Sequence, residues 1–126
     1  MKLRIRDDSL RLRLSRSEVA AIGRGEPVRA AMHVTPAAAL TYTLAPSAEV
    51  TAPEVQLEGS SLTVRIPAEA GRAWAESDDV SIRARQQAGD TELRVLIEKD
   101  FRCLAPREGE DEGDAFPHPR ADQERC

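Results

Sequence analysis

Eight arginines could give this chain an anion-binding surface, because all of them fall at alternate positions of segments that are predicted to be β-strands. The alternation places them on the face opposite the apolar side chains. Guanidinium groups bind phosphate oxygens through paired hydrogen bonds, so arginines that converge on one surface could bind a polyphosphate. The set is Arg4, Arg6, Arg11, Arg13, Arg65, Arg83, Arg85 and Arg94.

The same arginines also fit a solvated outer face of an antiparallel sheet, which is the commoner arrangement of such residues. Acidic residues on neighbouring strands would then be their partners, and Glu54, Glu58 and Glu92 are candidates. The two alternatives differ in shape. An anion site needs the arginines in a concavity, whereas a solvated face can be convex.

Residues for catalysis or metal binding are sparse. Cys103, His118 and Cys126, with Asp114 as a fourth ligand, are of the types that zinc binds, but they lack a Cys-x-x-Cys spacing. There is no Gly-x-Ser-x-Gly motif and no glycine-rich phosphate loop. We therefore predict no catalytic residue, no metal site and no cofactor. The sequence favours a non-enzymatic binding or interaction module, and the alternative is an anion- or phosphate-binding protein or phosphohydrolase that uses the arginines.

The composition limits the class of partner. The net charge of −4 argues against nucleic acid as the main partner. The chain has no secretory signal and no apolar run long enough to span a bilayer, so we expect a cytoplasmic protein that does not bind membranes. A protein or an anionic small molecule is the expected partner.

Two similar segments, residues 2–45 and 54–97, position the arginines. Each is predicted to fold as two strands, a short helix and two further strands. Seven apolar pairs match at a separation of 52 residues: Leu3 and Val55, Ile5 and Leu57, Leu10 and Leu62, Leu12 and Val64, Leu14 and Ile66, Ile22 and Trp74, and Val28 and Val80. The pattern predicts an α+β fold in which a duplicated ββαββ unit forms a mostly antiparallel curved sheet or barrel of about eight strands.

The two helices are predicted over residues 16–22 and 67–76. Ser15 and Glu18 have the spacing of a capping box, and Pro67 suits the first position of the second helix. Ile22 and Trp74 are expected to anchor the helices on the sheet.

The end of the chain has a different composition. Residues 1–104 are predicted to form one α+β domain, and residues 105–126 an acidic tail rich in proline and glycine. Phe116 would tether this tail so that its acids lie across four arginines and compete with an anionic ligand. The acids are Glu110, Asp111, Glu112 and Asp114, and the arginines are Arg4, Arg6, Arg11 and Arg13.

Two motifs resemble a family of small uncharacterised bacterial proteins of about this length. They are Glu98-Lys99-Asp100-Phe101-Arg102-Cys103-Leu104 and Asp114-Ala115-Phe116-Pro117-His118-Pro119. The family has no established function, so the resemblance assigns no site residue.

Two further likenesses concern architecture alone. Eight strands with interposed helices resemble the triphosphate tunnel enzymes, but residues 2–6 carry Lys and Arg where that family has paired glutamates. Residues 64–69 are similar to the strand-to-helix step of bacterial swapped-hairpin DNA-binding proteins, whose basic hairpins do not fit the acidity of this chain.

Overall fold

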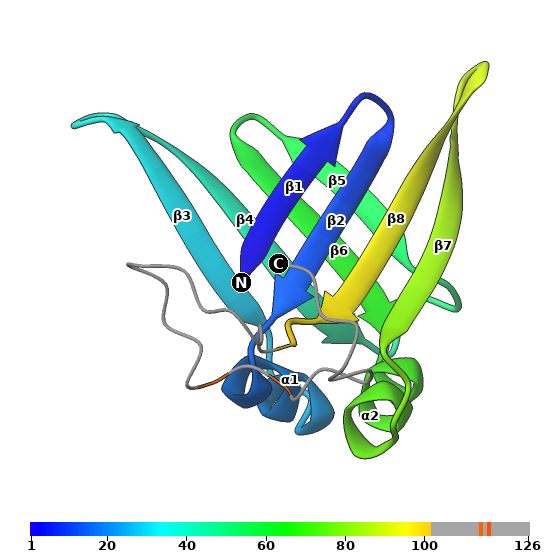
Figure 1. The fold of residues 1–126 in the computed structure, drawn as a ribbon. Coiled ribbons are helices and arrows are strands. Elements are labelled where there is room, and N and C mark those ends of the chain that lie inside the picture. The colour runs from blue at the N-terminus through cyan, green and yellow to red at the C-terminus, as the bar shows by residue number, and fades with distance from the viewer. Residues whose placement is uncertain (102–113, 115, 117–126) are drawn as a thin grey trace, which may run out of the picture.

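The computed structural model describes residues 1–101, 114 and 116. These residues form eight strands and two helices, and four of the strands lie between the helices in the sequence, which confirms the predicted α+β class (Figure 1). The first half contains β1 (Lys2–Arg6), β2 (Ser9–Leu14), α1 (Arg16–Gly23), β3 (Val28–Thr35) and β4 (Ala38–Ser47). The second half contains β5 (Glu54–Glu58), β6 (Ser61–Pro67), α2 (Ala68–Glu76), β7 (Ser81–Ala88) and β8 (Thr91–Lys99).

The strands divide between two four-stranded sheets, and the described residues form neither the single curved sheet nor the closed barrel that the sequence suggests. Sheet A has the order β1-β2-β8-β7, and sheet B has the order β3-β4-β6-β5. Every hairpin is antiparallel, as expected, whereas the central pairs β2–β8 and β4–β6 are parallel. Each sheet therefore joins one hairpin from each half of the chain. Alternation of side chains fixes the faces of a strand but not its neighbour, which is why this exchange was not predicted.

The registers of the two sheets correspond to each other. Leu12 lies opposite Leu3 and Ile97, and Val64 lies opposite Val55 and Leu44. Both Leu12 and Val64 are 1% exposed.

One predicted match between the halves is wrong. Val28 lies opposite Leu44, and the residue in the corresponding place opposite Ile97 is Ile82. Val80 precedes β7 and is 38% exposed. Ile82 follows Trp74 by eight positions, whereas Val28 follows Ile22 by six, and spacing alone does not reveal where the two extra residues are added.

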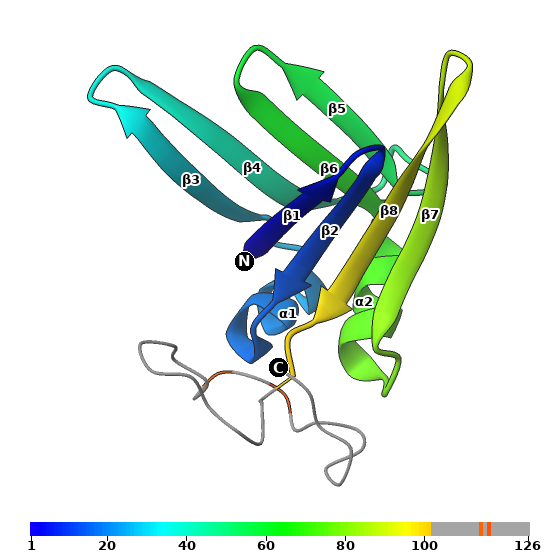
Figure 2. The ribbon, with the colours of Figure 1, turned by 45° about the horizontal axis from the view of Figure 1, so that its top comes forward.

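The core lies between the inner faces of the two sheets and the helices, which cover one end of both sheets (Figures 1 and 2). Ile22 is fully buried and Trp74 is 2% exposed, so both helices are anchored as predicted. The Trp74 indole Nε1 donates a hydrogen bond to the Val80 carbonyl oxygen at 3.1 Å, which satisfies its polar group. With few aromatic residues in the chain, the remaining buried apolar side chains are leucine, isoleucine and valine.

The two helices begin differently. The Ser15 hydroxyl accepts a hydrogen bond from the Glu18 backbone N–H, and the Glu18 carboxylate accepts one from the Ser15 N–H, which confirms the capping box. Pro67 is the last residue of β6 and the N-cap of α2, not its first helical residue. Its backbone is still extended, with ψ 134°, because it pairs with Ser47 of β4, so the helix begins at Ala68.

Two polar contacts join the sheets outside the core. The Gln86 side chain of β7 accepts a hydrogen bond from the Val55 N–H at 2.7 Å and donates one to the Val55 carbonyl at 2.9 Å. The Tyr42 hydroxyl donates to the Met1 carbonyl at 3.1 Å. Neither of the described helices has the length and apolar character needed to cross a membrane.

Candidate anion-binding site

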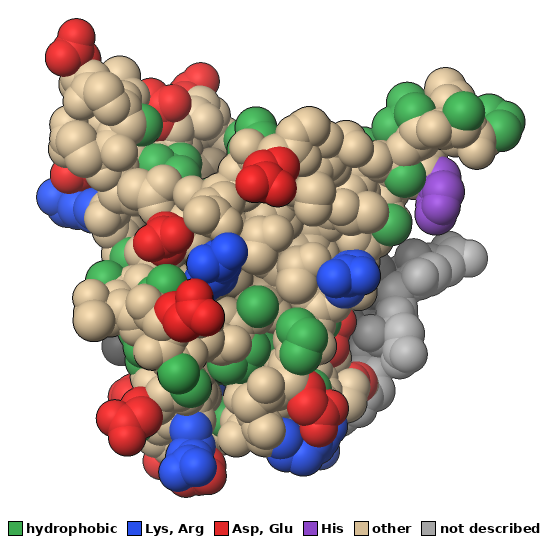
Figure 3. Space-filling model, turned by 180° about the vertical axis from the view of Figure 1, so that it is seen from behind, with side chains coloured by type: hydrophobic (Ala, Val, Ile, Leu, Met, Phe, Trp, Pro, Cys, Tyr) green, Lys and Arg blue, Asp and Glu red, His purple; other side chains and the backbone are tan. Residues whose placement is uncertain are grey.

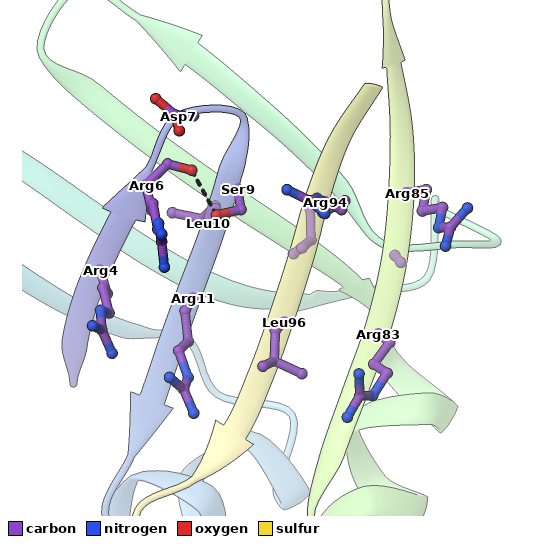
Figure 4. Close-up of a pocket in the computed structure, with 12 residues that line it drawn as sticks. Arg4, Arg6, Asp7, Ser9, Leu10, Arg11, Arg83, Arg85, Arg94 and Leu96 are labelled. Carbon is purple, nitrogen blue, oxygen red and sulfur yellow. Dashed lines mark hydrogen bonds between the residues drawn. The ribbon is translucent and has the colours of Figure 1, made fainter. Parts of the chain in front are cut away.

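An open cavity of about 780 Å³ lies over the outer face of sheet A (Figure 4). Six of the eight arginines that the sequence singles out line it, and we call it the arginine cavity. Its lining residues are Arg4, Arg6, Asp7, Ser9, Leu10, Arg11, Arg83, Ala84, Arg85, Arg94, Val95 and Leu96.

The strand registers arrange these side chains in two rows across the sheet. From β1 to β7, one row consists of Arg6, Ser9, Arg94 and Arg85, and the next consists of Arg4, Arg11, Leu96 and Arg83. Arg4 therefore lies directly opposite Arg11, and Arg85 directly opposite Arg94. Like charges in such positions destabilise a sheet, so the pairing itself gives the arginines no stabilising partner.

Carboxylates neutralise only part of this charge. Arg11 Nε donates to Glu98 Oε1 at 2.6 Å, and Arg85 lies 3.6 Å from a Glu92 oxygen. The four other arginines of the cavity form no ion pair within the described part of the chain, because no carboxylate oxygen there lies within 4.0 Å of their guanidinium nitrogens. These four are Arg4, Arg6, Arg83 and Arg94.

The next row of sheet A is nearly neutral. Arg13 Nε lies 2.9 Å from Glu98 Oε1 and 4.0 Å from an Asp100 oxygen, and Lys2 pairs with Asp100 at 3.0 Å. The Arg13 N–H is not directed at Glu98, so this contact is an ion pair without a hydrogen bond. Arg13 thus lies outside the arginine cavity.

The structure also separates Arg65 from the other seven arginines, because Arg65 lies on β6 in sheet B. Glu54 is its register partner on β5. The eight arginines are divided between the two sheets by strand pairing, and the alternation of side chains in the sequence does not specify which strands pair.

Glu98 is the important site residue that the sequence reasoning missed. Its side chain is almost buried, and its Oε1 atom lies close to both Arg11 and Arg13. The alternation along β8 places Glu98 on the same face as the arginines, and this could have been read from the sequence. Only the parallel pairing of β8 with β2 makes Glu98 the partner of Arg11 and Arg13.

The corresponding face of sheet B provides an internal comparison (Figure 3). By register, Gln56 and Glu58 stand where sheet A has Arg4 and Arg6, and Thr63 stands in place of Arg11. On the other hairpin, Thr41 corresponds to Arg94 and Ala31 to Arg85, while Arg29 corresponds to Arg83. The same strand geometry therefore forms with only one of the six cavity arginines, so the fold does not require the other five.

The rest of the lining offers little besides positive charge. Asp7 occupies the β1–β2 turn with φ 49°, a left-handed conformation that Asp tolerates better than most residues. The Ser9 hydroxyl donates to the Arg6 carbonyl at 2.7 Å. Among the described residues, the lining contains no histidine, cysteine or lysine, so the chemistry of this described lining is recognition of anions.

Comparison with known families places the chain as a whole. Residues 1–120 match a single family over almost the full length of the sequence. The chain belongs to DUF7009, a family of unknown function. Neither the curated proteins nor the solved structures include a match to it.

The end of this DUF7009 chain is described only at Asp114 and Phe116. The Asp114 carboxylate accepts hydrogen bonds from the Ser17 N–H, at 2.9 Å, and from the Ser17 hydroxyl. Asp114 therefore lies at the start of α1 and not on the arginines, which contradicts that part of the predicted tail placement. The reason is local: the exposed first turn of a helix offers unsatisfied N–H donors to a carboxylate.

Phe116 is held near the end of β8. Its N–H donates to the Asp100 carbonyl at 2.8 Å, its ring packs edge-on against Phe101, and the Lys99 ammonium lies 5.3 Å from its centre. The other acids of the predicted tail, Glu110, Asp111 and Glu112, lie outside the described residues.

Metal binding is the remaining sequence-based alternative. Cys103, His118 and Cys126 all lie outside the described residues of the DUF7009 chain. Among the residues that are described, no three His, Cys, Asp or Glu side chains are grouped so that they could hold a metal ion.

Proposed function

We propose that this protein is a binding module for an anionic, phosphate-bearing ligand, which occupies the arginine cavity on sheet A. One observation carries the proposal: six strand-borne arginines surround one open cavity, and four of them have no carboxylate partner among the described residues. A solvated face would need no concavity and would be expected to pair its arginines with neighbouring acids.

The distribution of charge in the arginine cavity supports an anion as its ligand. Arg4 and Arg11 face each other across one hairpin, and Arg85 and Arg94 across the other, so each hairpin carries a repulsive pair. A phosphate between two guanidinium groups replaces this repulsion with charge-assisted hydrogen bonds. The cavity volume of about 780 Å³ is typical of small-molecule sites.

Binding, and not hydrolysis, is the activity that the lining supports. Phosphoryl transfer needs a positioned nucleophile or base in addition to cations. Ser9 carries the only hydroxyl among the described lining residues, and its proton is donated to the Arg6 carbonyl. The only carboxylate of the described lining, Asp7, lies in the turn at the end of the hairpin and points away from the arginines (Figure 4).

Titration of the full-length protein with inorganic tripolyphosphate by calorimetry tests this function. The variant Arg83→Gln should bind about tenfold or more weakly, because a hydrogen bond to a charged group contributes about 1.5–3 kcal/mol. The variant Arg29→Gln is the matched control, since Arg29 holds the same register position in sheet B. It should bind as the parent does. No binding by the parent, or equal losses in the two variants, would refute the proposed function.

We also propose that residues 2–45 and 54–97 are copies of one ββαββ unit. The support is topological. Strands β1, β2, β8 and β7 of sheet A correspond to β5, β6, β4 and β3 of sheet B, and both sets lie in the same spatial order. The pair β2–β8 has the same direction and register as β6–β4. If the copies were once equivalent, five of the six cavity arginines differ between the two sheets and only Arg83 has an arginine counterpart, Arg29, as expected for a site and not for a structural requirement.

A further inference from the structure

The unpaired arginines of the arginine cavity form two clusters at its opposite sides. Arg4 and Arg6 both belong to β1, and we call them the β1 cluster. Arg83 of β7 and Arg94 of β8 form the β7–β8 cluster. In the close-up, the two clusters lie on either side of β2, whose Arg11 points toward the helix end of the sheet (Figure 4).

The floor between the clusters is less positively charged than the clusters themselves. Arg11 lies there, and it shares the Glu98 carboxylate with Arg13. On the two central strands, Ser9 lies beside Arg94 and Leu96 lies beside Arg11, and the Ser9 and Leu96 side chains are half-buried. A ligand in the arginine cavity therefore meets unpaired arginines at its two ends, and in its middle a polar side chain, an aliphatic side chain and the ion-paired Arg11.

The sheet geometry sets the distance between the two charged ends. Neighbouring strands lie about 4.8 Å apart, so β1 and β8 are separated by about 10 Å and β1 and β7 by about 14 Å. These distances join strand backbones, and the shorter one separates β1 from β8, which carries Arg94. A single phosphate would need arginines of both clusters to lean over the floor, whereas a ligand with a phosphate at each end binds both clusters without this movement.

We infer that the ligand is a small organic molecule with two phosphate groups at opposite ends, about 10 Å apart. One phosphate binds the β1 cluster, the other binds the β7–β8 cluster, and the neutral middle of the molecule lies over Ser9 and Leu96. This inference rests on the proposed anion-binding function and specifies its ligand class. A nucleic acid strand fits less well, since none of the described residues that line the cavity has an aromatic side chain to stack against a base.

Calorimetric titration of the full-length protein with alkanediol bisphosphates of increasing chain length provides the test. Inorganic pyrophosphate and an alkyl monophosphate serve as comparison ligands. Affinity should pass through a maximum at an intermediate length, and the best bisphosphate should bind at least about tenfold more tightly than the monophosphate because its second phosphate binds intramolecularly. Pyrophosphate that binds as tightly as the best bisphosphate would overturn the two-ended ligand but leave the anion site. No binding by any of these ligands would remove the proposed function as well.

Two variants separate a two-ended site from a general attraction of anions. Arg4→Gln weakens one end and Arg83→Gln the other, so each should reduce the advantage of the best bisphosphate over the monophosphate. Arg29→Gln on sheet B should leave this ratio unchanged. If either cavity variant weakens monophosphate and bisphosphate by the same factor, so that the ratio stays constant, the two-ended ligand is rejected. Circular dichroism and thermal melting should match the parent, since both arginines are exposed and unpaired among the described residues.

Discussion

Asp114 shows how one side chain can attach a distant segment to the fold. Its carboxylate receives hydrogen bonds from the Ser17 side chain and backbone, and its carbonyl accepts one from the Arg16 N–H at 2.6 Å. The Ser17 and Ser15 side chains, in that order, lower the pKa of Asp114 below its usual value. The ionised form is thus the form that binds to the start of α1.

The docking of Asp114 should weaken in acid. A carboxyl group whose pKa is lower in the folded state stabilises the fold above its unfolded pKa, and this contribution is lost as the pH falls through the folded pKa. We expect the Ser17 amide resonance to titrate at a pH below the usual range of an aspartate. The variant Asp114→Asn should abolish this titration, while Asp111→Asn serves as the control. A Ser17 resonance that is unchanged over the acid range would contradict the docking.

At the residue scale, much of the site followed from the sequence. The two-residue period placed all eight arginines on strand faces opposite the core, and the structure brings six of them to one cavity. What the sequence did not contain was the neighbour of each strand. Arg65 therefore could not be separated from Arg94, and Glu98 could not be recognised as the partner of Arg11.

At the scale of elements, the contact between the two helices depends on the small size of Gly23. A methyl group on Gly23 would lie 2.8 Å from the Ala75 Cβ, closer than real carbon atoms pack. Gly71 of α2 similarly lies against Ile22 and Ile66, both of which are fully buried. The helices thus approach each other where glycine leaves room.

Gly23→Ala should destabilise the protein by about 1–3 kcal/mol, because α1 and α2 must separate to accommodate the new methyl group. Ala75→Gly alone should cost about 1 kcal/mol through lower helix propensity. The double variant places a single methyl on the opposite helix, so its loss should be smaller than the sum of the two. Urea denaturation of all four proteins measures this coupling. Strict additivity would mean that the two residues do not determine the helix contact.

Local signals predicted most of the elements, because each depends on residues close together in the sequence. The capping box at Ser15 and the alternation of β1 and β2 are examples, and Pro67 was misplaced by only one position. The parallel strand pairs could not be predicted, because they join segments that are far apart in the sequence. Ser9 pairs with Arg94, and nothing in either segment specifies a partner so far along the chain.

At the scale of the whole molecule, neither half of the chain can complete a sheet alone. Strand β2 needs β8 and strand β4 needs β6, so the central pairing of each sheet crosses between the halves. The core likewise combines Leu12 and Leu44 of the first half with Val64 and Ile97 of the second. The arginine cavity depends on this pairing between the halves, because the β1 cluster belongs to the first half of the chain and the β7–β8 cluster to the second.

Cutting the chain in the connection between β4 and β5 should therefore give two fragments that need each other. Residues 1–50 and 51–126, purified separately and mixed, should form a one-to-one complex, because β2–β8 and β4–β6 pairing buries the apolar strand faces of both. Each fragment alone should unfold or self-associate. Size-exclusion chromatography with light scattering, together with circular dichroism, measures both properties. Leu12→Asp in the first fragment is the control that should prevent assembly, since Leu12 is 1% exposed. A folded monomer of either fragment would show that the exchanged hairpins do not hold the molecule together.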